Sequence, residues 1–409
     1  MVAALDIGWH SVSGARGDLT DPEISEVPAV SLEAATGDPP DGALSIEHDG
    51  ARRVLGSDAP ALAEETDDTV DRLVVDGFLE DAPYTPAVLA ALATETLGPA
   101  ADEERCAVAV PARSGTDART ATHRRIVEEA VSTAGYDPVP VTDGLAVIYD
   151  ELTEGDYTGL GVCLREGTTS VCLAYYGVPV LALSVPRGLA WVDERAADDL
   201  GQQRSEIRSA RESGVRLSPD GDDVVTALGA AFDELLTDLV SAVEGAAGDA
   251  EIPDGVSVPL VLGGRGAAVD GLDSLAAGRF DPSGLPVSIT DARSVSEPAS
   301  STVRGALVAA ESGVTDEEGV EWSPHTGADD SAGSSNADPS VGDGAALSDA
   351  DTPSPDASGS PDADSSVADG SDAGSAVADQ AVSELFDRLG AREEAVETLE
   401  AAVDDLEAT

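Results

Sequence analysis

Three glycine-bearing turns, each preceded by an apolar run, are the segments of this chain best suited to do chemistry. They lie at 8–11, at 167–169 and at 263–266. Glycine lets a backbone turn approach a phosphate closely, and successive N–H groups in such a turn form a concavity that binds anions. Two strand-turn-strand segments far apart in the chain, followed by a glycine turn at a helix entrance, predict a nucleotide clamped between two similar domains.

The elements that must position these turns alternate between apolar strands and longer helical patterns up to about residue 313. This alternation is typical of an α/β fold with large cores. A hairpin, a third strand and then helices begin at residue 2, and the same order begins again at residue 159. The pattern predicts strands at 2–6, 11–15, 43–47, 106–110, 138–141, 160–164, 170–175, 178–184 and 258–262, and helices at 86–96, 117–134, 144–151, 191–201, 205–212, 222–246 and 301–312.

The charge of the chain is large and one-sided. It carries 80 acidic residues against 22 basic ones, all of them arginine, for a formal net charge of -58. This charge opposes compaction at ordinary salt, whereas at molar salt the Debye length falls to roughly 3 Å and most of the repulsion disappears. We therefore expect the high-salt cytosol of an extreme halophile, in which the acidic residues form a solvated surface. A surface for cations or for a basic partner is the alternative.

Several functional classes are disfavoured by what the sequence lacks. It has no basic patch and no aromatic platform, so direct nucleic-acid binding is not expected. No stretch approaches the ~20 apolar residues of a spanning helix, and the N-terminus lacks the basic region of a signal peptide, so we expect no transmembrane segment. The four histidines are too scattered to predict a metal site. The cysteines stand in strand-like runs without metal-ligand spacing and are expected to be buried thiols; they are Cys106, Cys163 and Cys172.

The composition changes beyond residue 313. Residues 314–380 consist largely of Asp, Ser, Gly, Ala and Pro, and this composition predicts a disordered acidic linker. In the last segment, 381–409, Val and Leu recur at alternating spacings of three and four. This heptad pattern predicts an amphipathic helix that forms a coiled coil, with Arg392 as a polar residue in the seam. Self-association through 381–407 and docking of a lone helix on a partner or on the body both remain open.

With these motifs in this order, residues 1–313 resemble the actin-like ATPases, most closely the MreB-type actins and the haloarchaeal actin homologues of the salactin and volactin type. Further landmarks in the same order are Asp76-Gly77, the 109–112 segment before the helix that carries Arg124 and Arg125, the 141–144 segment, and the last helix.

The resemblance implies an actin-like ATPase fold, in which two RNase H-like domains surround a nucleotide cleft. It places domain I at 1–143, with an inserted subdomain at about 30–100, and domain II with a return helix at 144–313. The acidic linker and the C-terminal helix would follow this body as an appendage.

The resemblance also implies ATP and Mg²⁺ as cofactors and gives roles to individual residues. Asp6 would face the water shell of Mg²⁺, and Asp143 would orient the attacking water. Capping of the following helix is a compatible alternative for Asp143. The residues that it implies for nucleotide binding are Gly8, Trp9, His10, Ser11, Arg165, Gly167, Thr168, Thr169, Glu206, Gly263, Gly264, Arg265, Gly266 and Gly305.

The chain departs from the family pattern around the second turn. Cys163 stands where an aspartate is expected, and a thiol is a poor ligand for a hard cation such as Mg²⁺. Arg165 and Glu166 stand where glycines are expected. Glu166 is a candidate substitute for the missing metal ligand. Arg165 is either a phosphate contact through charge-assisted hydrogen bonds or a surface charge in a longer turn.

Two further assignments carry their own alternatives. Asp143 is one methylene shorter than the glutamate or glutamine of relatives, so we expect slow ATP hydrolysis. Glu206 matches a ribose contact, but Ser209 replaces the lysine that often follows it. A solvent-exposed helix position without a function is therefore the alternative for Glu206.

The resemblance implies a cytoskeletal protein whose polymerisation into filaments depends on ATP, with slow hydrolysis coupled to filament turnover and with itself as partner. Two alternatives remain open. A degenerate nucleotide-binding scaffold would bind partners without turnover, and a DnaK-like chaperone ATPase would not polymerise. The chaperone would need a β-rich peptide-binding domain, and the C-terminal segment does not resemble one.

Overall fold

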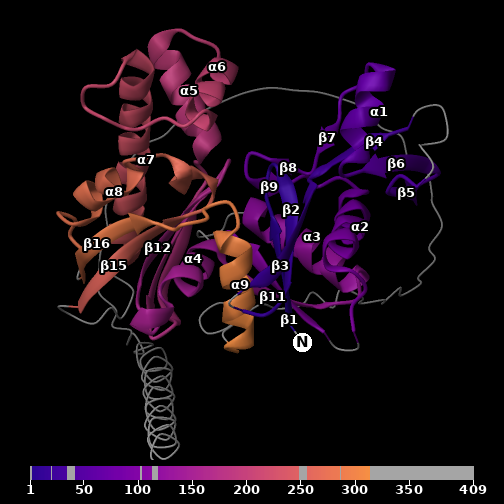
Figure 1. The fold of residues 1–409 in the computed structure, drawn as a ribbon, viewed down its shortest axis with the longest axis horizontal. Coiled ribbons are helices and arrows are strands. Elements are labelled where there is room, and N and C mark those ends of the chain that lie inside the picture. The colour runs from indigo at the N-terminus through magenta and orange to yellow at the C-terminus, as the bar shows by residue number, and fades with distance from the viewer. Residues whose placement is uncertain are drawn as a thin grey trace, which may run out of the picture. The chain divides into compact units, whose positions relative to one another are not determined.

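Two five-stranded sheets with the same topology form the body of the computed structural model (Figure 1). The orders are β11-β10-β1-β2-β3 and β14-β13-β12-β15-β16. In each sheet an antiparallel three-stranded meander is extended by two parallel strands beside its first strand. The strands are β1 Val2–Ile7, β2 Ser11–Gly17, β3 Pro22–Pro28, β10 Arg105–Val110 and β11 Asp137–Thr142, then β12 Gly159–Leu164, β13 Thr169–Tyr175, β14 Val178–Val185, β15 Val256–Gly263 and β16 Val287–Ser294.

Both sheets belong to one body, because residues 1–326 form a single compact unit. The structure describes residues 2–19, 21–34, 42–101, 104–112, 118–247, 256–285 and 287–313. The linker predicted at 314–380 and the helix predicted at 381–409 lie outside the described residues. Among the described helices, none combines the length and the apolar character that crossing a bilayer requires.

Helices cover each sheet and share a core with it, and we name each sheet with its helices a lobe. The first strands of the two meanders, β1 and β12, are buried almost throughout, as expected of strands covered on both faces. The first lobe contains α2 Thr85–Leu97 and α3 Ala118–Thr133. The second contains α5 Leu189–Leu200, α6 Arg204–Glu212, α7 Asp223–Ala247 and α8 Leu272–Phe280.

A small antiparallel sheet is attached to the first lobe, inside the range predicted for an insert. Its order is β5-β6-β4-β7, and α1 packs on it around a core of its own. A two-stranded hairpin follows it. The elements are β4 Val30–Glu33, β5 Ser45–His48, β6 Ala51–Leu55, α1 Asp58–Thr66, β7 Asp71–Arg72, and the hairpin strands β8 Val74–Val75 and β9 Phe78–Leu79.

Two helices, α4 Asp143–Glu151 and α9 Ser301–Glu311, join the lobes through a third core that includes residues of both sheets. They lie between the lobes in Figure 1. Glycine lets them approach each other closely, because a Cβ added to Gly305 would lie 1.7 Å from the backbone oxygen of Ala146. Gly305 therefore serves the crossing of these two helices.

Gly305→Ala should destabilise the fold, because the added methyl group has no room between α4 and α9. Overpacking of a core typically costs about 1–3 kcal/mol of unfolding free energy. Gly229→Ala is the matched control, since Gly229 lies inside α7 and an added Cβ there meets nothing within 4 Å. Alanine should stabilise that helix by about 1 kcal/mol. Denaturant titration in molar KCl measures both, and a Gly305→Ala variant as stable as the unmodified chain would contradict the close crossing.

Candidate functional site

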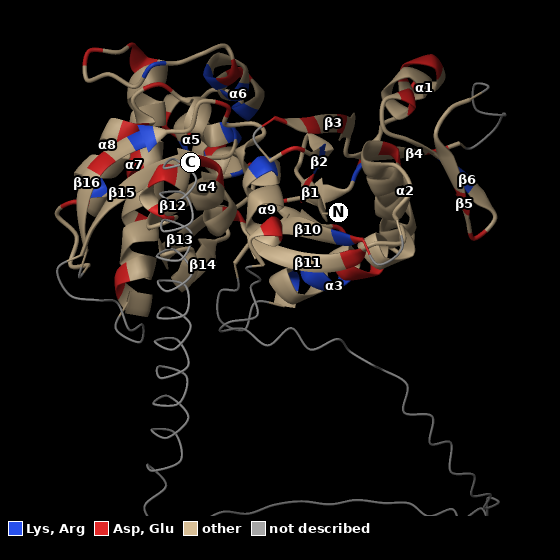
Figure 2. Cartoon of the chain, turned by 60° about the horizontal axis from the view of Figure 1, so that its bottom comes forward, with Lys and Arg blue, Asp and Glu red and all other residues tan. Residues whose placement is uncertain are grey.

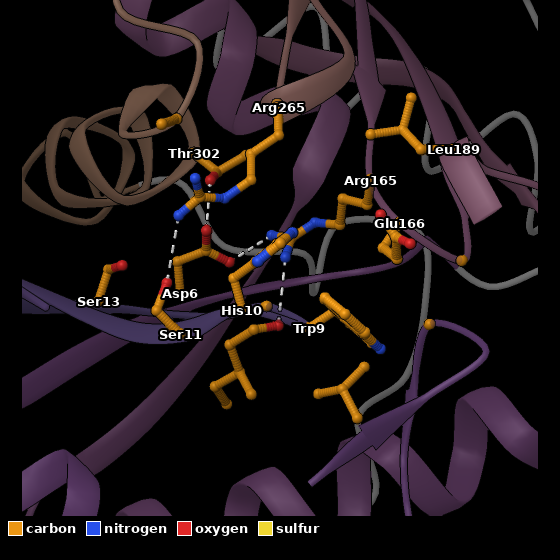
Figure 3. A pocket seen from close by; sticks show the side chains of 17 residues that line it. Asp6, Trp9, His10, Ser11, Ser13, Arg165, Glu166, Leu189, Arg265 and Thr302 are labelled. Carbon is orange, nitrogen blue, oxygen red and sulfur yellow. Dashed lines mark hydrogen bonds and ion pairs between the residues drawn. The ribbon is translucent and has the colours of Figure 1, made fainter. Parts of the chain in front are cut away.

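The turns of the two hairpins face each other across one cavity. In the first turn the N–H of Gly8 donates to the oxygen of Ser11 at 2.8 Å, and in the second the N–H of Arg165 donates to the oxygen of Thr168 at 2.9 Å. The space between them measures about 610 Å³ when the solvent at its open mouth is included. The predicted site residues that line it are Asp6, Gly8, Trp9, His10, Ser11, Arg165, Gly167, Gly264 and Arg265 (Figure 3).

Other predicted site residues lie near the cavity without lining it. Thr168 is fully buried in the second turn, and the hydroxyl of Thr169 donates to the oxygen of Arg187 at 2.9 Å. Gly263 and Gly266 serve packing, since a Cβ at Gly263 would lie 2.4 Å from Val147 and one at Gly266 would lie 2.6 Å from Leu164.

Glu206 is not among the residues that line the cavity. Its carboxylate accepts the N–H of Gln203 at 3.2 Å and closes a capping box at the start of α6. The contact with a ribose stays a prediction.

Arg165 bridges the two lobes. Its Nη2 donates to the carboxylate of Asp6 in β1 and, at 2.7 Å, to that of Asp143 at the start of α4, while Nη1 donates to the oxygen of Ile7 at 3.2 Å. The exposed fractions of these side chains are 14% for Arg165, 12% for Asp6 and 0% for Asp143. The interpretation of Arg165 as a surface charge in a longer turn is therefore wrong, because the side chain folds back into the cavity.

The two carboxylates are held by further hydrogen bonds. Asp6 accepts the hydroxyl of Thr302 in α9 at 2.7 Å, and Asp143 accepts that of Ser170 at 3.3 Å. Burial raises the pKa of Asp143, against the opposing effect of Arg165. Burial alone would lower the pKa of Arg165, but Asp143 and Asp6 raise it well above its usual value. The alternative in which Asp143 is the N-cap of α4 is not realised, because the helix begins at Asp143 itself and its N-cap residue is Thr142.

The residues around the second turn do not fit a bound Mg²⁺ ion. Cys163 is fully buried, and burial raises the pKa of its thiol, so the sulfur stays protonated. Glu166 accepts a hydrogen bond from Arg208 in α6, so the carboxylate predicted as a substitute metal ligand is already paired. In the described part of the chain no three His, Cys, Asp or Glu residues gather as a metal site.

Electrostatics weakens the site for a metal ion further. Arg165 already occupies the position where Asp6 and Asp143 would attract a cation. Two unit charges of like sign 4 Å apart repel by about 4 kcal/mol at an effective dielectric constant of about 20, so Arg165 offsets part of the attraction of the two carboxylates for a divalent ion.

More arginines contact residues that line the cavity. Acidic residues nevertheless outnumber basic ones in the chain, as the red and blue segments of Figure 2 show. Arg72 and Arg208 lie over the ring of Trp9, at 3.6 Å and 4.6 Å from its centroid, one from each lobe. Arg265 donates to Glu26 of β3 at 2.8 Å and to the hydroxyl of Ser11 at 3.4 Å. Arg165, Arg208 and Arg265 all come from the second lobe and contact the first.

The two lobes also make a direct backbone-to-backbone contact. A Cβ added to Gly167 would lie 2.1 Å from the backbone nitrogen of Gly77, in the turn between β8 and β9. Two glycines are needed at this contact because backbone meets backbone there. The hairpin therefore covers the second turn of the cavity.

Sequence reasoning missed three residues at the candidate site: Thr302, which lines the cavity, and Arg72 and Arg208, which lie over Trp9. The only signal for the two arginines was that basic residues are scarce in this chain. Because each arginine has many possible carboxylate partners, the sequence could not show which of them lie at the site. Thr302 carried no signal, since α9 reaches Asp6 only through the three-dimensional packing of the last helix on β1.

Comparison with known proteins agrees with this geometry. Residues 1–310 match the family model named Volactin. The chain belongs to the Volactin family. No curated protein matches this volactin-family chain.

Three solved structures are similar to this volactin-family chain, and the one with a TM-score above 0.5 shares its fold. A structure of the MamK double helical filament is 17% identical, covers 76% of this chain and 99% of its own, and has a TM-score of 0.52. A non-polymerising MamK mutant bound to AMPPNP is 18% identical with a TM-score of 0.49, over 76% and 98% of the chains. EutJ from Carboxydothermus hydrogenoformans is 14% identical with a TM-score of 0.45, over 75% and 89%. The predicted actin-like fold is confirmed.

His10 of this volactin-family chain should stay neutral to about pH 4, because burial and then Arg265, Arg72, Arg208 and Arg211 lower its pKa to about 4. An unfolded histidine titrates near 6.5, so the unfolded chain binds more protons between these values. The contribution of His10 to stability is therefore present above pH 6.5 and is lost as the pH falls toward 4. An NMR titration of the ring, assigned with a His10→Gln variant, measures the pKa, and a midpoint near 6.5 in the folded chain would contradict this geometry.

Proposed function

We propose that this chain is a cytoskeletal actin homologue that binds ATP in the cavity and forms nucleotide-dependent filaments in a haloarchaeal cytosol. The observation that carries the proposal is the pair of equivalent turns, one from each repeated sheet, that face one cavity crossed by arginines. The family and the fold support it. MamK, which shares the fold, forms a double helical filament, and this supports self-association as the kind of assembly to test.

The cavity offers donors for a polyphosphate. Arg165 and Arg265 stand on the wall contributed by the second lobe, and Ser11 stands on the opposite wall. Thr168 does not line the cavity, but its hydroxyl is buried in the adjoining turn and has no hydrogen-bond partner among the described residues. Guanidinium groups form strong, directional hydrogen bonds with phosphate oxygens. These residues fit a nucleoside triphosphate.

A bound polyphosphate would change how the lobes are held together. Arg165 and Arg265 now donate to carboxylates of the first lobe, and a phosphate would compete with Asp6 and Glu26 for them. A ligand shifts a conformational equilibrium only by binding one state better than the other. We infer that exchange of these arginine contacts makes the lobe arrangement, and with it the repeating contact of an open filament, depend on the nucleotide.

Hydrolysis should be slow. Asp143 would have to orient a water molecule, yet its carboxylate is fully buried and is held by Arg165 and Ser170. This observation also favours the second candidate function, a scaffold that binds nucleotide and recruits partners without turnover.

The remaining features complete the proposal. The division into domains at 1–143 and 144–313 follows the two sheets, and the surface charge suits a salt-rich cytosol. We propose that 314–380 is a tether and that the helix at 381–409 binds a second copy or a partner outside the body.

Filament formation is tested by sedimentation and negative-stain microscopy in molar KCl with ATP, with ADP or without nucleotide. We expect filaments with ATP and loss of the pellet without nucleotide. Gly167→Ala should weaken this response, because its Cβ would collide with Gly77, whereas Gly278→Ala should not, since nothing lies within 4 Å of its Cβ. A protein that stays monomeric in all three conditions would refute the filament, and binding without assembly or turnover would favour the scaffold.

A further inference from the structure

The guanidinium of Arg165 occupies the position between the two carboxylates of the cavity. It comes from the second lobe and pairs with Asp6 of the first lobe and with Asp143, which lies at the junction of β11 and α4. Arginine cannot lose its proton in a protein. The cation at this position is therefore supplied by the chain itself and is present under every condition in which the protein is folded.

The guanidinium keeps a donor that the protein does not use. Nη1 and Nη2 donate to Ile7, Asp6 and Asp143, but the Nε–H of Arg165 is buried and finds no hydrogen-bond partner among the described residues. The hydroxyl of Thr168, three residues further in the same turn, is in the same situation. Buried donors without an acceptor are costly, and these two belong to the turn whose residues Arg165, Glu166 and Gly167 line the cavity. An acceptor oxygen brought to this turn by a ligand of the cavity would satisfy them.

An anion with several oxygens meets this requirement, whereas a metal ion does not. A metal ion offers no acceptor to Nε–H, and it would compete with the guanidinium for Asp6 and Asp143. Arg265 on the same side of the cavity brings a second guanidinium within reach of Ser11 of the first turn (Figure 3). Phosphate oxygens between the two turns would then be matched by arginine donors from the second lobe.

We propose that Arg165 is the resident cation of this site, and that the chain holds the triphosphate of a nucleotide without a divalent metal ion. The inference rests on the proposed function, because it concerns how the same cavity binds its nucleotide. Arg165 offsets one of the two negative charges of Asp6 and Asp143 and would present Nε–H to the phosphate. The presence of Cys163 in place of the expected aspartate agrees with this arrangement, because a carboxylate at that position would have no metal ion to bind.

The test is calorimetric titration of the full chain with AMPPNP in molar KCl, once with excess EDTA and once with excess MgCl₂. We expect the two dissociation constants to agree within about threefold, a difference well below one hydrogen bond to a charged group. Affinity that falls by about tenfold or more in EDTA would overturn the inference while leaving the proposed function intact. Absence of binding in both buffers would overturn both. This comparison needs no variant.

Variants of Arg165 test whether its guanidinium is responsible for binding without a metal ion. Arg165→Gln should weaken binding in EDTA by about tenfold or more, and MgCl₂ should restore part of the loss by neutralising the carboxylates. Arg165→Lys keeps the charge and should bind equally with and without MgCl₂, although more weakly because it lacks the Nε–H donor. Arg195→Gln is the matched control, since Arg195 pairs with Asp199 and Glu234 on the exposed side of the second lobe. Circular dichroism in the same buffers establishes that each variant is folded, and unchanged binding by folded Arg165→Gln would overturn the inference.

Discussion

The ion cluster of Arg165 with Asp6 and Asp143 is the interaction on which the rest of the site depends. It joins the second lobe to the first at the point where their hairpin turns meet. Removing one partner of a buried ion pair typically costs about 3–5 kcal/mol, because the other charge is left unpaired. Molar salt screens exposed pairs strongly and buried pairs much less. The cluster therefore keeps its strength under conditions in which the exposed ion pairs of this chain lose most of theirs.

The same cluster explains why the cavity is lined by arginines in a chain with a net charge of -58. Each carboxylate that the fold buries needs a cation or several hydrogen-bond donors. A row of such pairs runs from the cavity into the second lobe, where Glu166 pairs with Arg208, and Asp193 is held by Arg211 at 2.7 Å and 2.8 Å. The second turn is thus connected to α5 and α6 through buried charges.

Much of the fold could be predicted from the sequence, because apolar periodicity marks elements that are buried. The predicted helices at 86–96 and 144–151 correspond to α2 and α4, and the hairpin predicted to occur twice is present as β1–β2 and as β12–β13. In the insert, the strands β4 and β6 to β9 and the helix α1 were missed. In the two main sheets, β3 and β16 were missed. They are edge strands with many exposed positions, and proline begins and ends β3, so their apolar signal is weak. The helix α8 was missed because its small residues dilute its apolar face.

The site was predictable as a set of turns but not as a set of contacts. In the sequence, glycines and hydroxyl residues indicated where the backbone would approach a ligand. Most residues of the first turn do line the cavity. The direction of Arg165 could not be read from its neighbours in sequence, because Asp6 and Asp143 reach it only when both sheets are assembled. Gly305 was predicted as a site residue, but it lies against Ala146 at the crossing of α4 and α9. The sequence alone does not distinguish a glycine required by helix packing from one required by a ligand.

The most direct test of the central claim is a crystal structure of the chain with AMPPNP, grown from molar KCl in the presence of MnCl₂, with anomalous data that locate manganese. We expect phosphate oxygens within hydrogen-bond distance of Arg165 Nε and no manganese peak between Asp6 and Asp143. A manganese ion at that position with Arg165 displaced, or a nucleotide bound outside the cavity, would contradict the claim.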